Sequence, residues 1–276
     1  MERATYSDIL HNAKVKVYPD GRACLLVLDR PVIRAAGWEA ERPAEGSSWE
    51  ELGEDEKEAR NLSRAQRRAK TAVADLAMCN PLRYFLTLTI DPQRCERYDP
   101  TEILRHLRYW LDNNVRRRGL LYVLIPELHK DGAVHFHALV NDALQLVDSG
   151  TMIPPAGGKP SRPRSAAQRA AWLTNGGAIV YNVPGWSWGF STAIELHGDR
   201  DRAIGYVTKY ITKSTAKIGG RWYYSGGELQ RPEGFTADLD CGKAFTNRDV
   251  FEIQELGCKG VKIWTDELGS LLEELG

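Results

Sequence analysis

The sequence predicts an α+β fold in which helices pack on an antiparallel sheet. Short runs rich in aromatic and β-branched residues, at 84–90, 134–140 and 178–183, predict strands. Longer segments with apolar residues three or four positions apart, such as 63–78 and 101–115, predict amphipathic helices. Turn residues connect neighbouring strands directly, and such hairpins make the sheet antiparallel.

The N-terminal part combines a hairpin with an acidic stretch. Residues 13–29 form two apolar runs around Pro19-Asp20-Gly21, which predicts a hairpin. Residues 39–58 hold nine acidic residues against Arg42 and Lys57, a composition typical of a linker. Ser63 is expected to cap a helix that runs to about Met78. We therefore divide the chain into a hairpin with an acidic linker (1–60), a central domain (61–225) and a partly helical C-terminal tail (226–276).

The central domain alternates strands and helices. The strand at 84–90 stops at Asp91-Pro92, and a helix begins at Thr101. Residues 143–176 contain Pro154-Pro155 and Gly157-Gly158, which predicts a long irregular insertion. The other expected elements are strands at 121–126, 134–140, 178–183, 192–196 and 222–224, and a helix from Asp199 to near Gly219.

The charge distribution favours a phosphate-binding protein. The net charge is zero, but the acidic residues gather at 39–58 and 252–276, so the rest of the chain is basic. A basic surface between acidic flanks is typical of a nucleic-acid binder, although solvated helix faces give a similar pattern. The candidate phosphate contacts are Arg64, Arg67, Arg68, Lys70 and Lys213.

Other compositional features exclude several classes of protein. The longest apolar runs are far shorter than the ~18 residues of a membrane span. Met1-Glu2-Arg3 is not followed by the apolar region of a signal peptide, so we expect a cytoplasmic protein without membrane partners. Five cysteines without a Cys-x-x-Cys pair argue against a zinc knuckle or a disulfide framework.

His135-Phe136-His137 is the first motif that carries chemistry. Two imidazoles two positions apart on a strand point to the same face and can ligate one divalent metal. If Lys130-Asp131-Gly132 is a three-residue loop, Glu127 pairs with His135 and completes a His–His–carboxylate site. A two-residue Asp-Gly turn would instead slip the register by one residue and turn Glu127 away. We favour the first register, with His129 as the reserve ligand, and Mn²⁺ or Mg²⁺ as the ion.

Tyr206-Val207-Thr208-Lys209-Tyr210 is the second such motif. Two tyrosines four residues apart on a helix share a face. A free phenol, with a pKa of about 10, is a poor nucleophile at neutral pH, and a nearby cation stabilises its phenolate. We therefore predict Tyr206 and Tyr210 as catalytic nucleophiles that attack a phosphodiester. Lys209 is expected to stabilise charge on the transferring phosphate.

With these motifs, the chain resembles the HUH endonuclease superfamily, and most closely the rolling-circle replication initiators of phages and small plasmids. Three segments match in order: Phe85-Leu86-Thr87-Leu88-Thr89, His135 to Val140, and Tyr206 to Tyr210. The resemblance implies a central five-stranded antiparallel sheet flanked by helices (HUH/RRM-like). The hairpin that carries Glu127, His135 and His137 would lie in the middle of this sheet.

The resemblance also implies an activity. Such proteins nick single-stranded or hairpin origin DNA through a 5′-phosphotyrosine intermediate, and two-tyrosine members use both phenols to start and end replication. Single-tyrosine members keep the residue that matches Tyr210, which ranks Tyr210 before Tyr206 for the first attack. No Gly-x-x-x-x-Gly-Lys-Ser/Thr loop occurs in the sequence, so a separate helicase is expected as a partner.

Three other interpretations remain open. A relaxase or a transposase uses the same chemistry on other DNA. A non-catalytic RNA-binding module would stack bases on Tyr84 and Phe85. A histidine-triad hydrolase needs a third histidine where this chain has Leu139.

Overall fold

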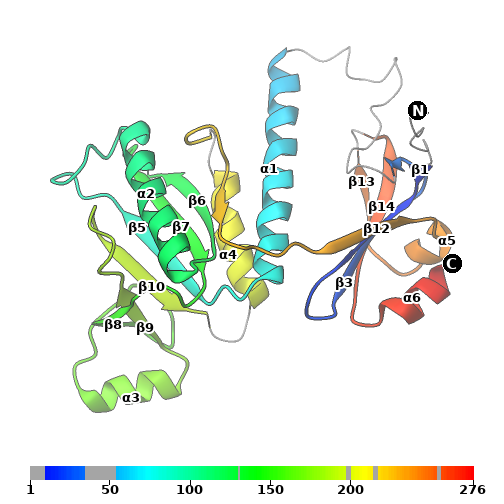
Figure 1. Ribbon diagram of the computed structural model, residues 1–276. Coiled ribbons are helices and arrows are strands. Elements are labelled where there is room, and N and C mark those ends of the chain that lie inside the picture. Colours follow the sequence, from blue (N-terminus) through cyan, green and yellow to red (C-terminus); the bar gives the residue numbers. More distant parts are fainter. Residues whose placement is uncertain (1–9, 35–53, 130, 197–199, 214–216, 254–255) are drawn as a thin grey trace. The chain divides into compact units, whose positions relative to one another are not determined.

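The computed structural model describes residues 10–34, 54–129, 131–196, 200–213, 217–253 and 256–276. The chain divides into two compact units, one of residues 61–230 and one that joins residues 1–60 to residues 231–276 (Figure 1). Both units combine antiparallel sheets with helices, which confirms the α+β class. Most of the acidic stretch, together with Asp199, lies outside the described residues.

A seven-stranded antiparallel sheet forms the framework of residues 61–230. Its order is β11-β6-β7-β5-β10-β9-β8. The strands are β5 (Tyr84–Thr89), β6 (Tyr122–Leu128), β7 (Val134–Val140), β8 (Val147–Ile153), β9 (Ala178–Asn182), β10 (Ser191–Glu195) and β11 (Tyr224–Gly226). The helices are α1 (Glu54–Cys79), whose first turns precede residue 61, α2 (Pro100–Arg118), α3 (Ala166–Thr174) and α4 (Arg200–Lys213).

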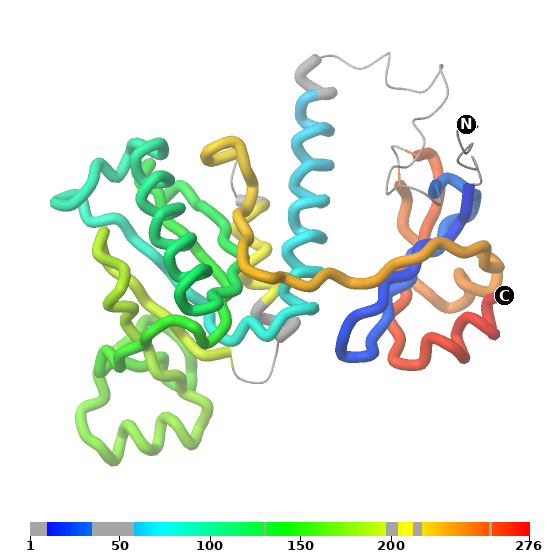
Figure 2. The backbone as a smooth tube through the Cα atoms, viewed as in Figure 1, coloured from blue at the N-terminus to red at the C-terminus, as the bar shows by residue number. Residues whose placement is uncertain are grey.

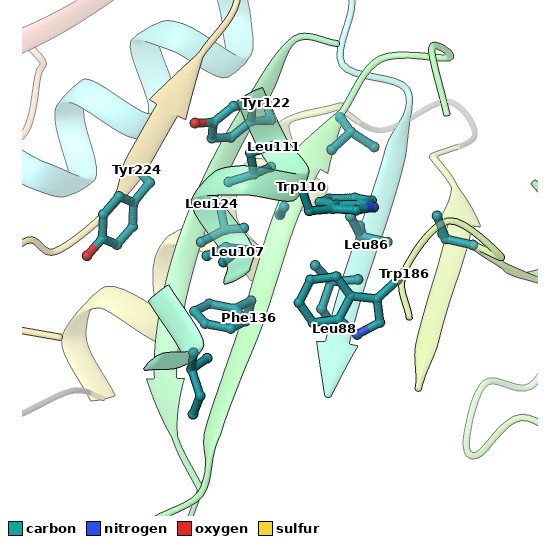
Figure 3. Close-up of a cluster of buried hydrophobic side chains, with 14 of the residues drawn as sticks. Leu86, Leu88, Leu107, Trp110, Leu111, Tyr122, Leu124, Phe136, Trp186 and Tyr224 are labelled. Carbon is teal, nitrogen blue, oxygen red and sulfur yellow. The ribbon is translucent and has the colours of Figure 1, made fainter. Parts of the chain in front are cut away.

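Helix α2 covers one face of this sheet (Figure 1). It begins at a capping carboxylate, because the Asp99 side chain accepts a hydrogen bond from the Thr101 amide at 2.8 Å. It ends at Gly119, whose φ of 68° is the left-handed conformation that glycine adopts readily. Its apolar side packs on side chains from the central strands, and Figure 3 shows this core around Phe136. The core includes Leu86, Leu88, Leu107, Trp110, Leu111, Tyr122, Leu124 and Trp186.

The alternation of side chains along each strand defines the opposite face. Since Phe136 and Leu86 point into the core under α2, His137 and Thr87 point to the other side of the sheet. There α4 lies against β6 and β7. Its Val207 and Ile211 are fully buried, so one apolar stripe anchors the helix.

Several details differ from the sequence-based expectations. The resemblance implies five strands, but the sheet has seven, so the five-strand count is wrong. Strand β11 overlaps the strand expected at 222–224 but begins at Tyr224, and β8 was not expected. Strand β8 and helix α3 lie within 143–176, which is therefore not an irregular insertion. Helix α1 begins at Glu54, so Ser63 lies inside it and does not cap it.

The other unit is a five-stranded antiparallel sheet in the order β12-β2-β3-β14-β13, beside a short β1–β4 pair. Its elements are β1 (Leu10–His11), β2 (Ala13–Val17), β3 (Ala23–Leu28), β4 (Ile33–Arg34), β12 (Glu233–Ala237), α5 (Cys241–Phe245), β13 (Val250–Ile253), β14 (Cys258–Thr265) and α6 (Leu268–Leu275). The predicted N-terminal hairpin is β2–β3. The tail expected to be helical also supplies β12, β13 and β14, and in Figure 2 its orange and red segments lie beside the blue hairpin.

Helices α5 and α6 complete the core of this unit. Val15, Leu25 and Val261 pack with Leu271 and Leu275, all of them buried. The Asn12 amide ties the two ends of the chain together, because its Nδ2 donates to the carbonyls of Leu28 and Leu239. The Leu239 amide donates back to Asn12 Oδ1 at 2.9 Å.

Within the described part of the chain, no helix has the length and apolar character needed to cross a membrane. All five cysteines have free thiols.

Candidate active site

The hairpin of β6 and β7 has the register that brings Glu127 to the histidines. Glu127 pairs with His135, and the His129 amide donates to the Ala133 carbonyl at 2.8 Å. Gly132 closes the loop with a φ of 86°, a conformation that costs a glycine little. The three-residue loop is therefore confirmed, and the two-residue turn is wrong.

His137 is held at both ring nitrogens. Its Nε2 lies 2.9 Å from Glu127 Oε2, and its Nδ1 lies 3.2 Å from Thr87 Oγ1. Thr87 pairs with His137 across β5 and β7, so the sheet register places this hydroxyl. His137 as a whole is only 8% exposed. A hydrogen bond to the remote ring nitrogen fixes the orientation of a metal-ligating imidazole, and Thr87 is placed to make it.

His135 stands on the same face, one row along the strand. Its ring stacks on that of His129, with centroids 5.1 Å apart and an interplanar angle of 20°. Burial lowers the pKa of His135 below its ordinary value, and the neighbouring His129 lowers it further. His129 Nδ1 is itself 3.2 Å from Asp131 Oδ1. His135 therefore favours the neutral imidazole, the form that ligates a metal.

The three predicted ligands, His135, His137 and Glu127, are neighbours in pairs, but their ligand atoms do not all point to one common position. Glu127 contacts His137 and faces His135 across the strand pair. Among the described residues, only Cys95, Glu102 and His106 bring three ligand-type atoms within 4.8 Å of one another. Binding of one ion by His135, His137 and Glu127 therefore requires the side chains to close in.

Helix α4 brings Tyr210 onto His137 and holds Tyr206 beside Tyr210. The Tyr210 ring stacks on the His137 ring, with centroids 3.8 Å apart and an interplanar angle of 18°. The Tyr210 hydroxyl donates a hydrogen bond to the Tyr206 oxygen at 2.8 Å. The Phe85 ring packs edge-on against Tyr206 at 5.2 Å. Residues separated by about 70 positions in the sequence thus form one cluster of imidazole, carboxylate and phenols.

The two phenols differ in environment. Tyr210 is 7% exposed and Tyr206 is 50% exposed. Burial raises the pKa of Tyr210 well above its usual range, and the hydrogen bond to Tyr206 raises it further. Tyr210 is therefore held as a neutral donor, whereas Tyr206 is half exposed and its oxygen accepts the hydrogen bond.

The predicted basic residues are distributed over two helices. Lys209 lies exposed on α4 beside the tyrosines, and Lys213 is the last residue of that helix, with its side chain outside the described part. On α1, Arg67 and Arg68 are exposed, while Arg64 and Lys70 are half-buried. The imidazole and phenol cluster itself is built from β5, β6, β7 and α4, so the residues of α1 belong to a different element.

Sequence reasoning did not identify Thr87 and Phe85 as parts of this cluster. Both residues lie in the strand predicted at 84–90. The sequence does not show that this strand pairs with 134–140, so it does not place them beside His137. The group of Cys95, Glu102 and His106 was also missed. Glu102 and His106 share a helix face, but Cys95 joins them only through the fold of the loop before α2.

Residues 83–215, just under half of the chain, match the model of a family described as replication-associated protein, of the ORF2 and gene 2 protein type. The match begins at the start of β5 and extends through α4, so it contains the histidines, Glu127 and both tyrosines. No curated protein and no solved structure is detectably similar to the chain.

Proposed function

We propose that this chain is a metal-dependent DNA nickase of the HUH superfamily, because residues 83–215 match the model of a replication-associated protein family of rolling-circle replication initiators. It cuts one strand of an origin through a 5′-phosphotyrosine intermediate and rejoins strands when a round of replication ends. The observation that carries the proposal is the stacking of Tyr210 on His137, together with the hydrogen bond that Tyr210 donates to Tyr206.

The donor set at the hairpin fits a divalent ion. His137 Nε2 and Glu127 Oε2 already point at one another, and His135 favours its neutral form on the same face. One carboxylate and two imidazoles do not by themselves select one ion, and an open site that must also hold a phosphate oxygen favours Mn²⁺ or Mg²⁺ over Zn²⁺. When bound, the ion polarises a non-bridging phosphate oxygen and helps to position the strand.

Tyr206 is the better placed nucleophile for the first cut, which reverses the order that the resemblance implies. Half of its surface is exposed, and it accepts a hydrogen bond from Tyr210. A hydrogen bond to an ionised oxygen is stronger than one between neutral groups, so Tyr210 supports the phenolate of Tyr206. The Tyr206 phenol gives up its proton to water as its oxygen bonds to phosphorus. The bond from phosphorus to the 3′ oxygen breaks, and that oxygen takes a proton from water and leaves as a 3′-hydroxyl.

Tyr210 and Lys209 complete the proposed chemistry. The phosphotyrosine bond conserves the energy of the phosphodiester, so a 3′-hydroxyl can later attack it and reseal the strand without ATP. While Tyr206 carries the DNA, Tyr210 is a second phenol for a second cut. Lys209, exposed on the same helix, is proposed to stabilise charge on the phosphate.

Basic residues away from the cluster are proposed to hold the DNA. Arg64, Arg67, Arg68 and Lys70 on α1 contact phosphates without reading sequence, and so does Lys213 at the end of α4. The origin is single-stranded or hairpin DNA, and a separate helicase opens the duplex ahead of the nick.

The alternative of a non-catalytic RNA-binding module is disfavoured by packing. Phe85 lies against the rings of His137 and Tyr206, and Tyr84 packs edge-on against Tyr181 at 6.2 Å. Both rings thus pack against aromatic side chains of the protein itself, which disfavours their use as stacking platforms for RNA bases. A relaxase or a transposase would share the chemistry, and the sequence of the cut origin distinguishes them.

The proposal is tested by covalent capture. The protein is incubated with a library of single-stranded oligonucleotides and Mn²⁺, and adducts that survive boiling in detergent are counted. We expect an adduct that chelation of the metal abolishes and that His135→Ala or His137→Ala removes. His11→Ala, in the other unit, is the matched control and keeps the adduct. Reversible binding without any adduct, or full cleavage by both histidine variants, would contradict the proposal.

A further inference from the structure

Phe190 is an exposed aromatic residue that neither the core nor the proposed chemistry uses. It lies on the connection between β9 and β10, and 70% of its surface is exposed. The two tryptophans of the same connection are packed: Trp186 meets Trp110 edge-on at 5.5 Å, and Trp188 stacks on His106 at 3.5 Å. The connection thus places its larger rings against the protein and leaves Phe190 toward solvent.

The sheet register places Phe190 in line with the proposed metal ligands. The Thr89 amide donates to the Phe190 carbonyl at 2.8 Å, one step beyond the Ser191–Leu88 pair. Thr89 in turn pairs with His135, and His135 with Glu127. Residues directly opposed across a sheet share a face. Phe190 therefore stands on the face of His135, two strands away, or about 10 Å.

The backbone that carries Phe190 is tightly constrained. The Asp91 amide donates to the Trp188 carbonyl at 3.0 Å, and Trp186 Nε1 donates to the Thr89 carbonyl at 3.3 Å. A Cβ on Gly189 would collide with the Thr89 carbonyl oxygen and lie 2.6 Å from the Asp91 nitrogen. Only glycine allows this close approach, and the result is an aromatic side chain on a fixed support. A preorganised support lowers the entropic cost of binding.

We propose that Phe190 is a stacking subsite for an unpaired nucleobase next to the nicked phosphate. The inference rests on the proposed function and adds to it a residue that holds the strand. The nearest side chains on this face are those of Thr89, Thr87 and Thr192, and the half-buried Phe85 and Ile194 follow farther along the same strands. Phe190 is thus an exposed ring with hydroxyl side chains beside it. Such a ring matches the size of one base, whereas a protein partner would need a broader apolar patch.

The test is a thermodynamic cycle that needs no knowledge of the origin sequence. Affinity is measured for a thymidine oligonucleotide of about 12 residues and for a strand of equal length and charge that lacks bases. In the wild-type protein the bases strengthen binding. Phe190→Ala is expected to weaken binding of the thymidine strand by about 5- to 150-fold and to leave the abasic strand unchanged.

Two further variants separate stacking from general effects. Phe190→Trp keeps an aromatic face and is expected to retain affinity, whereas Phe190→Leu keeps only apolar bulk and should resemble alanine. Tyr109→Ala is the matched control: Tyr109 is also 70% exposed, but it belongs to α2, which covers the opposite face. Equal losses on both strands, an effect of Tyr109→Ala as large as that of Phe190→Ala, or no loss at all would overturn the inference. Covalent capture is a separate measurement, so a failed subsite does not imply a failed nickase.

Discussion

Removal of the Tyr210 hydroxyl tests whether Tyr206 makes the first attack while Tyr210 supports it through a hydrogen bond. Tyr210→Phe keeps the ring that stacks on His137 and deletes only the donor to Tyr206. If Tyr206 makes the first attack, this variant still forms the first adduct, but more slowly. Tyr206→Phe, in contrast, removes the nucleophile, and its first adduct is lost or moves to the buried Tyr210.

The size of the effect follows from the one hydrogen bond that is lost. A hydrogen bond to a charged group contributes about 1.5–3 kcal/mol, and each 1.36 kcal/mol changes a rate tenfold. Tyr210→Phe should therefore slow the first cleavage by roughly 10- to 150-fold.

The assay is single-turnover formation of the adduct, with its site mapped by mass spectrometry. The double variant should form none, and Tyr223→Phe is the control because Tyr223 lies outside the helix. The reasoning is refuted if the wild-type adduct maps first to Tyr210, or if Tyr206→Phe cleaves at the wild-type rate. An adduct on Tyr223 or Tyr224 would refute the assignment of both phenols.

Two further predictions concern stability and DNA binding. Phe136→Ala, which empties a fully buried position between the sheet and α2, should lower the free energy of unfolding by about 3–5 kcal/mol; an unchanged urea midpoint would contradict the described core. Neutralising Arg67 and Arg68 together should reduce the slope of log affinity against log salt for single-stranded DNA by about 1.4, since each phosphate contact contributes roughly 0.7. An unchanged slope would exclude α1 as a phosphate contact.

The hairpin could be predicted in detail because its determinants are local. Gly132 sits where a three-residue loop needs a left-handed residue, and the period of two along β7 then places His135 and His137 together. The helical period likewise places Tyr206 and Tyr210 on one face. What remained unknown was the distance between these two motifs, which depends on how α4 packs on β6 and β7.

The missed elements depend on contacts that are distant in sequence. Strand β8 contains Asp148, Ser149 and Gly150, which disfavour strands, and it exists because it pairs with β9 across an irregular register. The partners of the N-terminal hairpin lie more than 200 residues away, in β12 and β14. No local pattern reports such pairings, so residues 226–276 looked like a tail.

The sheet shared by the two ends of the chain has a consequence for biosynthesis. Strand β3 emerges from the ribosome well before its neighbour β14 (Cys258–Thr265), because more than 200 residues separate them. A two-stranded hairpin alone is marginally stable, so this unit cannot complete its sheet until β14 has been translated. Residues 61–230, which are contiguous, can fold in the meantime. A premature stop near residue 230 would therefore release a folded unit of residues 61–230 attached to a β2–β3 hairpin that lacks its sheet neighbours β12 and β14.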